Sequence, residues 1–390
     1  MSVEDLTISI RNFKTNTGSL AMKTGSLKLN GRGLLPVVFV TGALCLAALM
    51  PGCSDNPGSV EQTDNTLEYV TPEEAGYSSE ALEEAETCAE DGDYAAVMAL
   101  SDGKVFFSYG DISRNYKCHS IRKPFLGALY GIHVGQGHID LDATLEDLEI
   151  DDAPTSLTRA EKQARVRDLL KSRSGVYIPA AAEAPEMEAE RPERGSHPPD
   201  TYYWYNNWDF NALGTIFEQE TGTRIFEEFE SRIADVVGME DFSIDECFYQ
   251  LEAEKSMHPA YHFRMSARDM ARFGVLYQND GVWRGRRIIP GDWIDESLTG
   301  YSLMDSTYEV SYGYMWMTAP EGTPAADLFA SPCFFHTGAG VHLLVVWPDL
   351  RLVVVIRLDT DGAWVDPGDG LQMDLVQKIV NARLPWPESE

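Results

Sequence analysis

Basic side chains are scarce in this chain of 390 residues, which holds 31 lysines and arginines against 62 aspartates and glutamates. The formal net charge at pH 7 is −31. A surface of this sign repels phosphate backbones and anionic lipid headgroups, so no nucleic-acid partner is expected. Solubility explains the acidic excess more simply than an interaction does. The sequence also has no Cys-x-x-Cys pair and no internal repeat, which argues against a thiolate zinc site and a repeat architecture.

An apolar stretch near the N-terminus has the pattern of an export signal. The stretch is Leu34–Met50, and it follows three basic residues, Lys23, Lys28 and Arg32. A basic segment, an apolar segment and a small-residue site in this order are typical of a secretory signal. We therefore expect residues 1–52 to be a signal region and the protein to be exported, to the periplasm or the cell surface.

The end of this signal region suggests a lipid anchor. The residues Met50-Pro51-Gly52-Cys53 resemble a bacterial lipobox, whose cysteine is lipidated after cleavage. This predicts that the protein contacts a membrane only through a lipid at Cys53, with plain secretion and a retained anchor as alternatives. Met22 makes a better signal start than Met1. Residues 53–66 are polar without an apolar period and are predicted to be a flexible tether.

Four cysteines lie beyond the signal region and tether: Cys88, Cys118, Cys247 and Cys333. In an exported protein four thiols allow three disulfide pairings, and spacing does not choose among them. Free buried thiols are an equal alternative, because a core of this size needs no cross-links.

Secondary-structure signals divide the rest of the chain. Two alternating runs around Ser101–Lys104 predict a hairpin over 95–109, and strand signals return after residue 310. Between them the apolar period is helical. We expect an α+β fold: an antiparallel sheet flanked by helices, with an inserted all-α subdomain. The predicted domain spans 67–386, with an α/β body at about 67–135 and 301–386 and a helical insert at about 136–300. Individual elements are predicted as helices at 159–171, 210–220, 226–237, 267–277, 290–298 and 370–382, an exposed loop at 180–199, and strands at 312–316, 343–347 and 352–358.

Ser120 and Lys123 are the first candidates for chemistry. Pro124 cannot donate the amide that a helix interior requires, so it must lie in the first turn of a helix. The spacing of three then places both side chains on one face, at the end where developing negative charge is favoured. A lysine desolvated there would have a lowered pKa and could take the serine proton. The alternative is an N-cap serine beside a surface lysine.

Two later motifs favour the catalytic interpretation. Tyr205-Asn206-Asn207 precedes a predicted helix, and His336-Thr337-Gly338 leads into a predicted strand. With Ser120-x-x-Lys123 ahead of them, these motifs resemble, in type and order, the serine β-lactamase and penicillin-binding-protein superfamily, closest to its class C and esterase-like branch. The resemblance covers about residues 70–385 and implies the α+β fold predicted above.

The resemblance also implies a role for each matching residue. Ser120 would be the acyl-accepting nucleophile, and Lys123 would be the base that activates it. Tyr205 would hydrogen-bond the lysine and relay a proton to the leaving group; its alternative is a core aromatic. Asn207 would contact the lysine and the substrate, unless it is the N-cap of the helix that follows.

The third motif would form the opposite wall of the site. His336, Thr337 and Gly338 would line the substrate, and the backbone amides of Ala339 and Ser120 would form the oxyanion hole. His336 departs from the lysine typical of β-lactamases and DD-peptidases, where a permanent cation recognises a substrate carboxylate. A histidine is mostly neutral near pH 7 and anchors an anion less well. This departure shifts the expected substrate toward esters or amides.

These observations predict an exported serine hydrolase that hydrolyses a small ester or amide through an acyl-enzyme. A β-lactamase or DD-peptidase acting on β-lactams or cell-wall peptides is one alternative, and a non-catalytic ligand-binding homologue is another. The sequence shows no deacylation base beyond Tyr205. No cofactor is expected and no metal either, because Pro259 separates His258 from His262 and no carboxylate stands as in His-Glu-x-x-His.

Overall fold

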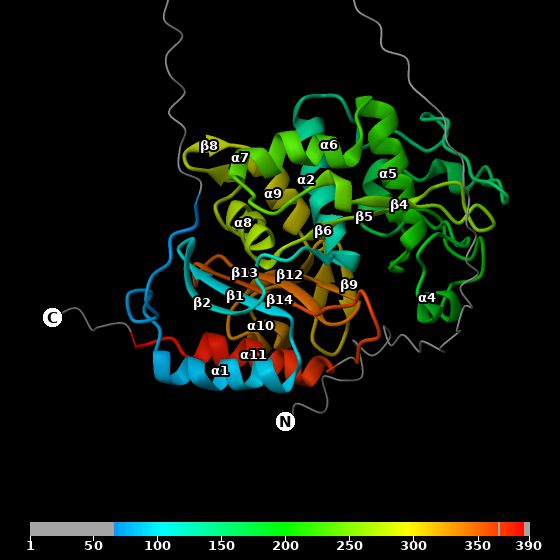
Figure 1. Ribbon diagram of the computed structural model, residues 1–390. Helices are drawn as coiled ribbons and strands as arrows, with labels where there is room; N and C mark the ends of the chain where they lie inside the picture. The colour runs from blue at the N-terminus through cyan, green and yellow to red at the C-terminus, as the bar shows by residue number, and fades with distance from the viewer. Residues whose placement is uncertain (1–65, 366, 386–390) are drawn as a thin grey trace, which may run out of the picture. The chain divides into compact units, whose positions relative to one another are not determined.

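The computed structural model describes residues 66–365 and 367–385 (Figure 1). The predicted signal region 1–52, the lipidation site Cys53 and all of the predicted tether except its last residue lie outside the described residues. Within the described part of the chain, no helix combines the length and the apolar character that crossing a bilayer requires.

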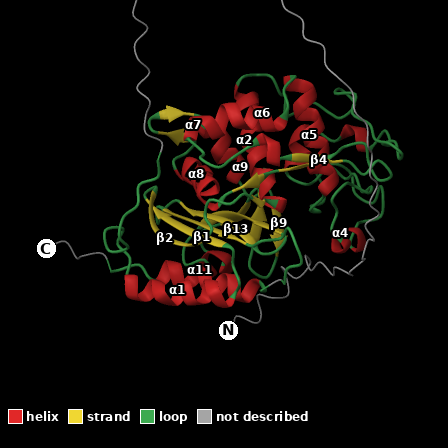
Figure 2. Ribbon diagram, in the orientation of Figure 1, coloured by secondary structure: helices red, strands yellow, loops and turns green. Residues whose placement is uncertain are grey.

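An eight-stranded antiparallel sheet forms the centre of the described fold (Figure 2). Its first and last strands in sequence lie side by side, because β1 pairs with β14 from Ala96 opposite Arg357 to Ser101 opposite Leu352. The N-terminal hairpin therefore shares one sheet with the C-terminal strands, as the sequence predicted. In spatial order the strands are β2 (Lys104–Gly110), β1 (Ala96–Ser101), β14 (Leu352–Arg357), β13 (His342–Trp347), β12 (Cys333–Gly338), β11 (Met317–Ala319), β10 (Val310–Tyr312) and β9 (Ser302–Asp305).

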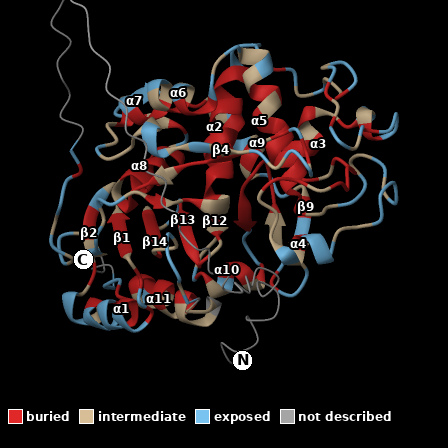
Figure 3. Cartoon of the chain, turned by 45° about the vertical axis from the view of Figure 1, so that its right-hand side comes forward, coloured by how far each residue is buried: buried red, intermediate tan, exposed pale blue. Residues whose placement is uncertain are grey.

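Helices cover both faces of this sheet. The helices α1 (Ser79–Asp91) and α11 (Asp369–Asn381) lie together on one face, and α8 (Ala267–Gln278) and α2 (Arg122–Gly135) lie on the other (Figures 1 and 2). Every residue of β13 and β14 is buried, which explains their continuous apolar sequences (Figure 3). The helix α8 can approach β14 closely because Gly274 has no side chain; a Cβ there would lie 2.6 Å from a Val353 methyl carbon.

The predicted insert is mainly helical and also contains short strands. Three two-stranded ladders occur in or beside it, where runs of two or three residues are too short to produce a readable period. In addition, α8 packs on the sheet and belongs with the body. The helices are α3 (Val166–Leu170), α4 (Pro185–Ala189), α5 (Asn207–Thr221), α6 (Ile225–Phe229), α7 (Asp235–Val237) and α9 (Gly291–Leu298), and the ladders are β3 (Tyr116–Lys117) with β6 (Arg264–Met265), β4 (Phe248–Gln250) with β5 (Ala260–His262), and β7 (Val282–Trp283) with β8 (Arg286–Arg287).

Three local predictions were wrong. The helix predicted at 159–171 forms as α3 only over its last part. Of the strand predicted at 312–316, only Tyr312 lies in a strand, as the last residue of β10; residues 313–316 form the turn to β11, where Gly313 donates its amide to the Trp316 carbonyl and Met315 has a φ of 60°. The loop predicted at 180–199 begins with buried residues and includes α4. A helix, α10 (Pro324–Leu328), lies between β11 and β12 and was not predicted.

The four cysteines of the described chain are free thiols. Cys88, Cys118 and Cys333 are buried, and Cys247 is half-buried. Burial raises the pKa of the Cys88 thiol to about 11 and that of Cys247 to about 12. Of the two alternatives open at the sequence level, the buried free thiol holds, and no reactive thiolate results.

Candidate active site

The segment that carries Ser120 is a tight turn between β3 and α2. Residues His119–Ile121 form a single 3₁₀ turn, and α2 begins at Arg122, so Pro124 lies in its first turn as predicted. His119 has a φ of 48°, a left-handed conformation that is rare for a residue with a side chain. Ser120 is partly accessible at the end of a helix that is otherwise buried along its first three turns. The turn thus presents the hydroxyl at the positive end of α2.

Lys123 is in contact with this hydroxyl. Its Nζ donates a hydrogen bond of 2.9 Å to Ser120 Oγ, and its side chain is only 1% exposed. Burial, with a further contribution from the neighbouring Arg122 guanidinium, holds the pKa of Lys123 well below its usual value. Lys123 is therefore a buried amine beside an accessible serine, and the alternative of a surface lysine is excluded.

Tyr205 lies on the other side of the same amine. The Lys123 Nζ lies 4.6 Å from the centre of the Tyr205 ring. Burial raises the pKa of Tyr205, and a hydrogen bond with Ser120 acts in the opposite direction. Ser120, Lys123 and Tyr205 therefore meet in space, although 82 residues separate the lysine from the tyrosine in the sequence.

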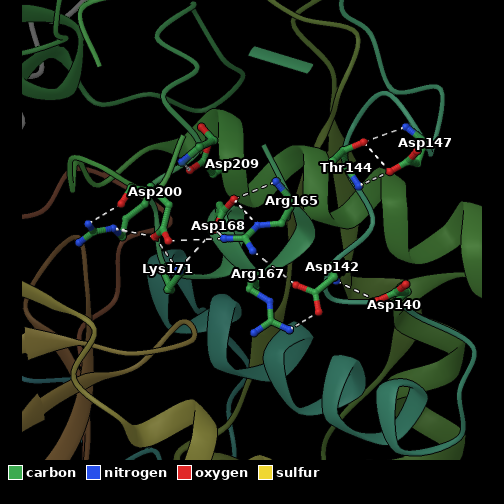
Figure 4. Close-up of polar contacts among 12 residues, drawn as sticks. Asp140, Asp142, Thr144, Asp147, Arg165, Arg167, Asp168, Lys171, Asp200 and Asp209 are labelled. Carbon is green, nitrogen blue, oxygen red and sulfur yellow. Dashed lines mark hydrogen bonds and ion pairs between the residues drawn. The ribbon is translucent and has the colours of Figure 1, made fainter. Parts of the chain in front are cut away.

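A network of charged side chains anchors the segment that leads into Tyr205 (Figure 4). Asp200 accepts a hydrogen bond from Lys171 at 2.6 Å and forms an ion pair with Arg173 at 3.1 Å. Asp168, which is 1% exposed, pairs with Arg165 at 3.2 Å within the first turn of α3. The network ties the 200–204 segment to the end of α3, so the approach to Tyr205 is held on two sides.

A buried carboxyl group, that of Asp209, links the segments before and after Tyr205. Asp209 is fully buried and accepts hydrogen bonds from Ser174 Oγ at 2.5 Å and from Asn206 Nδ2 at 3.0 Å. Burial raises the pKa of Asp209 well above its usual range. The Ser172 hydroxyl also bonds to this segment: it accepts a hydrogen bond from the Asn206 backbone amide at 2.9 Å and donates one to the Trp204 carbonyl at 2.8 Å. These contacts fix the backbone on either side of Tyr205.

Asn207 is not joined to this cluster. Asn206, and not Asn207, is the N-cap of α5, because its side chain accepts the Trp208 amide at 3.0 Å. Asn207 Nδ2 donates to the Ala182 carbonyl at 2.6 Å, and its Oδ1 has no hydrogen-bond partner among the described residues. Its amide nitrogen thus holds the 180–184 segment.

His336 lies on β12 on the same side of the sheet. It is fully buried, and its ring centre is 6.5 Å from that of Tyr205. Its Nδ1 contacts the Thr337 carbonyl at 2.8 Å and therefore carries the proton, which leaves Nε2 as an acceptor with no partner in the described chain. Burial, with the nearby Lys123, lowers the pKa of His336 to about 3. This wall of the site therefore holds a neutral imidazole at pH 7.

The end of β12 touches the turn that carries Ser120. A Cβ on Gly338 would lie 2.9 Å from the Cys118 carbonyl oxygen and 3.2 Å from the His119 Cβ, so only glycine fits there. Ala339, whose amide the predicted oxyanion hole would use, is the next residue in the chain. Among the described residues, β11 pairs with Cys333–Phe335, and its ladder does not extend to the 336–338 segment.

Thr337 is placed differently from the sequence prediction. Side chains alternate along a strand, so Thr337 faces away from His336 and toward α10 and α11. There it lines an apolar cavity together with Phe335. The predicted substrate wall at His336 and Gly338 therefore does not include the Thr337 side chain.

Two buried guanidinium groups beside the site were not singled out from the sequence. Arg122 donates to the Tyr261 carbonyl at 3.1 Å and stacks over the Tyr261 ring at 4.4 Å. Arg357 donates to the carbonyls of Tyr116 and Lys117 at 2.9 and 3.1 Å. Neither forms an ion pair with any described carboxylate. Arg122 is adjacent to Lys123 in sequence and could have been noticed, whereas Arg357 is 237 residues from Ser120 and nothing local marks it.

The sheet with helices on both faces, and a serine–lysine pair at the start of a buried helix, define a fold of the β-lactamase and penicillin-binding-protein type. A family model described as Beta-lactamase matches residues 95–378. Because the match spans well over half of the chain, this protein belongs to the beta-lactamase family, whose members are mostly serine hydrolases. No curated protein matches the sequence.

Solved structures support the fold. A protein from Bacillus anthracis, described as a candidate 6-aminohexanoate-dimer hydrolase, is 20% identical with a TM-score of 0.58, over 77% of this chain and 82% of that one. A penicillin-binding-protein homologue from Caulobacter crescentus is 15% identical with a TM-score of 0.60, over 80% and 98%. A class C beta-lactamase is 14% identical with a TM-score of 0.58, over 78% and 96%. At these identities the likeness establishes the fold alone.

Proposed function

We propose that the protein is a serine hydrolase that forms an acyl-enzyme on Ser120 and hydrolyses a small, uncharged ester or amide. The observation that carries this proposal is the 2.9 Å contact between the Ser120 hydroxyl and the buried Lys123 amine. A binding protein has no need for a desolvated amine, whose burial disfavours its charged form. A base that must be neutral near pH 7 requires such an environment.

The proposed acylation uses three groups. Neutral Lys123 accepts the Ser120 proton as Oγ bonds to the substrate carbonyl carbon, and the oxyanion forms beside the amides of Ser120 and Ala339. Tyr205 passes a proton to the leaving alcohol or amine as the carbonyl carbon–heteroatom bond breaks. Water then attacks the ester on Ser120 and releases the acid, with Lys123 and Tyr205 returning to their first protonation states.

The character of the site favours an uncharged substrate. His336 occupies the motif position at which β-lactamases and DD-peptidases typically have a lysine, and its lowered pKa keeps it neutral. The net charge of −31 adds a general repulsion of anions. The Bacillus anthracis structure, described as a candidate 6-aminohexanoate-dimer hydrolase, supports amide hydrolysis as one of the two proposed reactions. The N-terminal signal pattern supports export, so we propose that the reaction takes place outside the cytoplasm.

Covalent labelling tests the proposal. The wild-type protein and Ser120→Ala would each be treated with a fluorophosphonate and with labelled penicillin, and intact mass would be measured over time. We expect a fluorophosphonate adduct on the wild type only, slow or absent penicillin adduct, and turnover of short-chain nitrophenyl esters. Failure of both reagents to label the wild type contradicts the catalytic proposal and leaves the ligand-binding alternative. A penicillin adduct that hydrolyses within seconds supports the β-lactamase alternative.

A further inference from the structure

The apolar cavity that Thr337 lines is on the far side of β12 from Ser120. It lies between β9, β10, β11 and β12 on one side and α10 and α11 on the other, and the space there is about 800 Å³ when the open solvent at its mouth is counted. Its wall is almost entirely apolar. The side chains that determine its character are Met304, Met317, Leu328, Phe329, Phe335 and Met373.

The strand β12 separates this cavity from the candidate active site. Phe335 and Thr337 line the cavity, and Phe335 packs on Phe329 with ring centres 4.9 Å apart. Phe334 faces the opposite way, with its ring 5.1 Å from that of Trp316, and His336 follows it on that face. A ligand in the cavity and a substrate on Ser120 would therefore occupy opposite faces of one strand.

Two polar groups of the wall restrict the ligand. Among the described residues that line the cavity, Asp305 is the one charged side chain, and none is basic. An anion would thus meet a carboxylate with no compensating cation. Thr337 is half-buried, and no described residue hydrogen-bonds to its hydroxyl, so that hydroxyl can bond to a neutral oxygen of a ligand.

The remaining lining suits a flexible chain. Three methionines contribute to the wall, and methionine adapts its shape to irregular apolar ligands. Gln372 also lines the cavity, and its Nε2 donates to the Val341 carbonyl at 2.5 Å, in the turn that follows Ala339. The cavity is therefore connected, through one hydrogen bond, to the backbone that carries the predicted oxyanion-hole amide.

We propose that this cavity is a second ligand site that binds an uncharged aliphatic chain bearing a neutral oxygen, such as a medium-chain alcohol. The charge of the wall selects against fatty-acid anions, and the Thr337 hydroxyl holds the oxygen of the ligand. Binding at this site does not depend on Ser120 chemistry, so it can be tested independently of the proposed hydrolase function.

Ligand-observed NMR on the purified protein tests the proposal, with 1-octanol, 1-decanol and decanoate as probes at pH 7.5. We expect both alcohols to bind, with affinity rising about fourfold for each added methylene. Decanoate should bind at least tenfold more weakly than decanol. Absence of alcohol binding, or equal binding of decanoate, would overturn the proposal.

Two variants assign the binding to this cavity. Leu328→Trp fills it, and Asp327→Trp places the same ring on the exposed side of the same helix as a control. We expect the first to weaken decanol binding at least tenfold and the second to leave it unchanged. Should Leu328→Trp fail to fold, the nearly isosteric Thr337→Val is expected to weaken decanol binding about three- to tenfold through the lost hydrogen bond. Unchanged affinity in the folded variants contradicts the assignment.

Labelling of Ser120 separates this site from the active site. Decanol affinity would be measured before and after treatment with a fluorophosphonate, and again on Ser120→Trp, which blocks the active site whether or not the protein labels. We expect unchanged affinity in each case. Loss of decanol binding in either case means that the alcohol occupies the Ser120 site, and the second site is then wrong.

Discussion

Replacing Gly338 by alanine tests how closely β12 must approach the turn that carries Ser120. The added Cβ would lie 2.9 Å from the Cys118 carbonyl oxygen, whereas ordinary contact begins at 3.4 Å. Strand and turn must therefore separate by about 0.5 Å, the difference between these distances. Overpacking of this kind costs about 1–3 kcal/mol of unfolding free energy.

The same displacement moves the Ala339 amide away from the oxyanion. A misplacement of 1 Å costs roughly 100-fold in rate, so half of that predicts a loss of about tenfold in kcat/KM. Turnover of a nitrophenyl ester and urea unfolding would be measured on Gly338→Ala. Gly362→Ala is the matched control, because a Cβ there meets nothing within 4 Å. If Gly338→Ala matches the wild type in both assays, the proposed contact between β12 and the turn does not position the oxyanion hole.

Three further substitutions test the electrostatics of the site. Lys123→Ala is expected to lower ester turnover by more than about 1000-fold, since base and nucleophile act as a unit; retained activity would mean that the base lies elsewhere. His336 has a pKa of about 3 when folded and about 6.5 when unfolded, so the unfolded state binds more protons as the pH falls. When the pH is lowered from 7.5 to 5, the unfolding free energy of the wild type should therefore fall by about 2 kcal/mol more than that of His336→Gln. Urea titrations at the two pH values measure both losses, and equal losses would contradict this pKa. Arg357→Met leaves two buried carbonyls unpaired and should lower the unfolding free energy by about 2–4 kcal/mol. The control Arg351→Met removes a half-exposed ion pair and should lower it by under about 1 kcal/mol. Equal losses would show that the buried guanidinium does not stabilise the fold.

Much of the body could be predicted because its signals are local. The runs at 343–347 and 352–358 are apolar throughout, and the structure buries them as β13 and β14. The turn at 101–104 joins β1 and β2 as its residues indicate. Pro124 limits where α2 can begin, since a proline is tolerated in the first turn of a helix. Local backbone chemistry is sufficient in each of these cases.

Only those residues of the candidate site that belong to short sequence motifs could be predicted. Ser120, Lys123 and Tyr205 stand in recognisable patterns, and the structure brings all three together. The cap of α5 is Asn206, one residue from the predicted alternative, because two adjacent asparagines have the same preference and only the geometry of the preceding loop distinguishes them. Arg357 carries no local signal, since its partners are carbonyls supplied by a distant strand.

The sequence by itself determined the class of fold and marked Ser120 and Lys123 as the candidate nucleophile and base, because helix starts, apolar runs and short motifs are properties of neighbouring residues. Tertiary structure alone decided which face of β12 each residue occupies: His336 lies toward Tyr205, and Thr337 lies in the cavity beneath α10. Alternation along a strand gives opposite faces, but only packing on both sides of the sheet decides which face meets the nucleophile. The same packing removes water from Lys123, and this burial converts a common lysine into a candidate base.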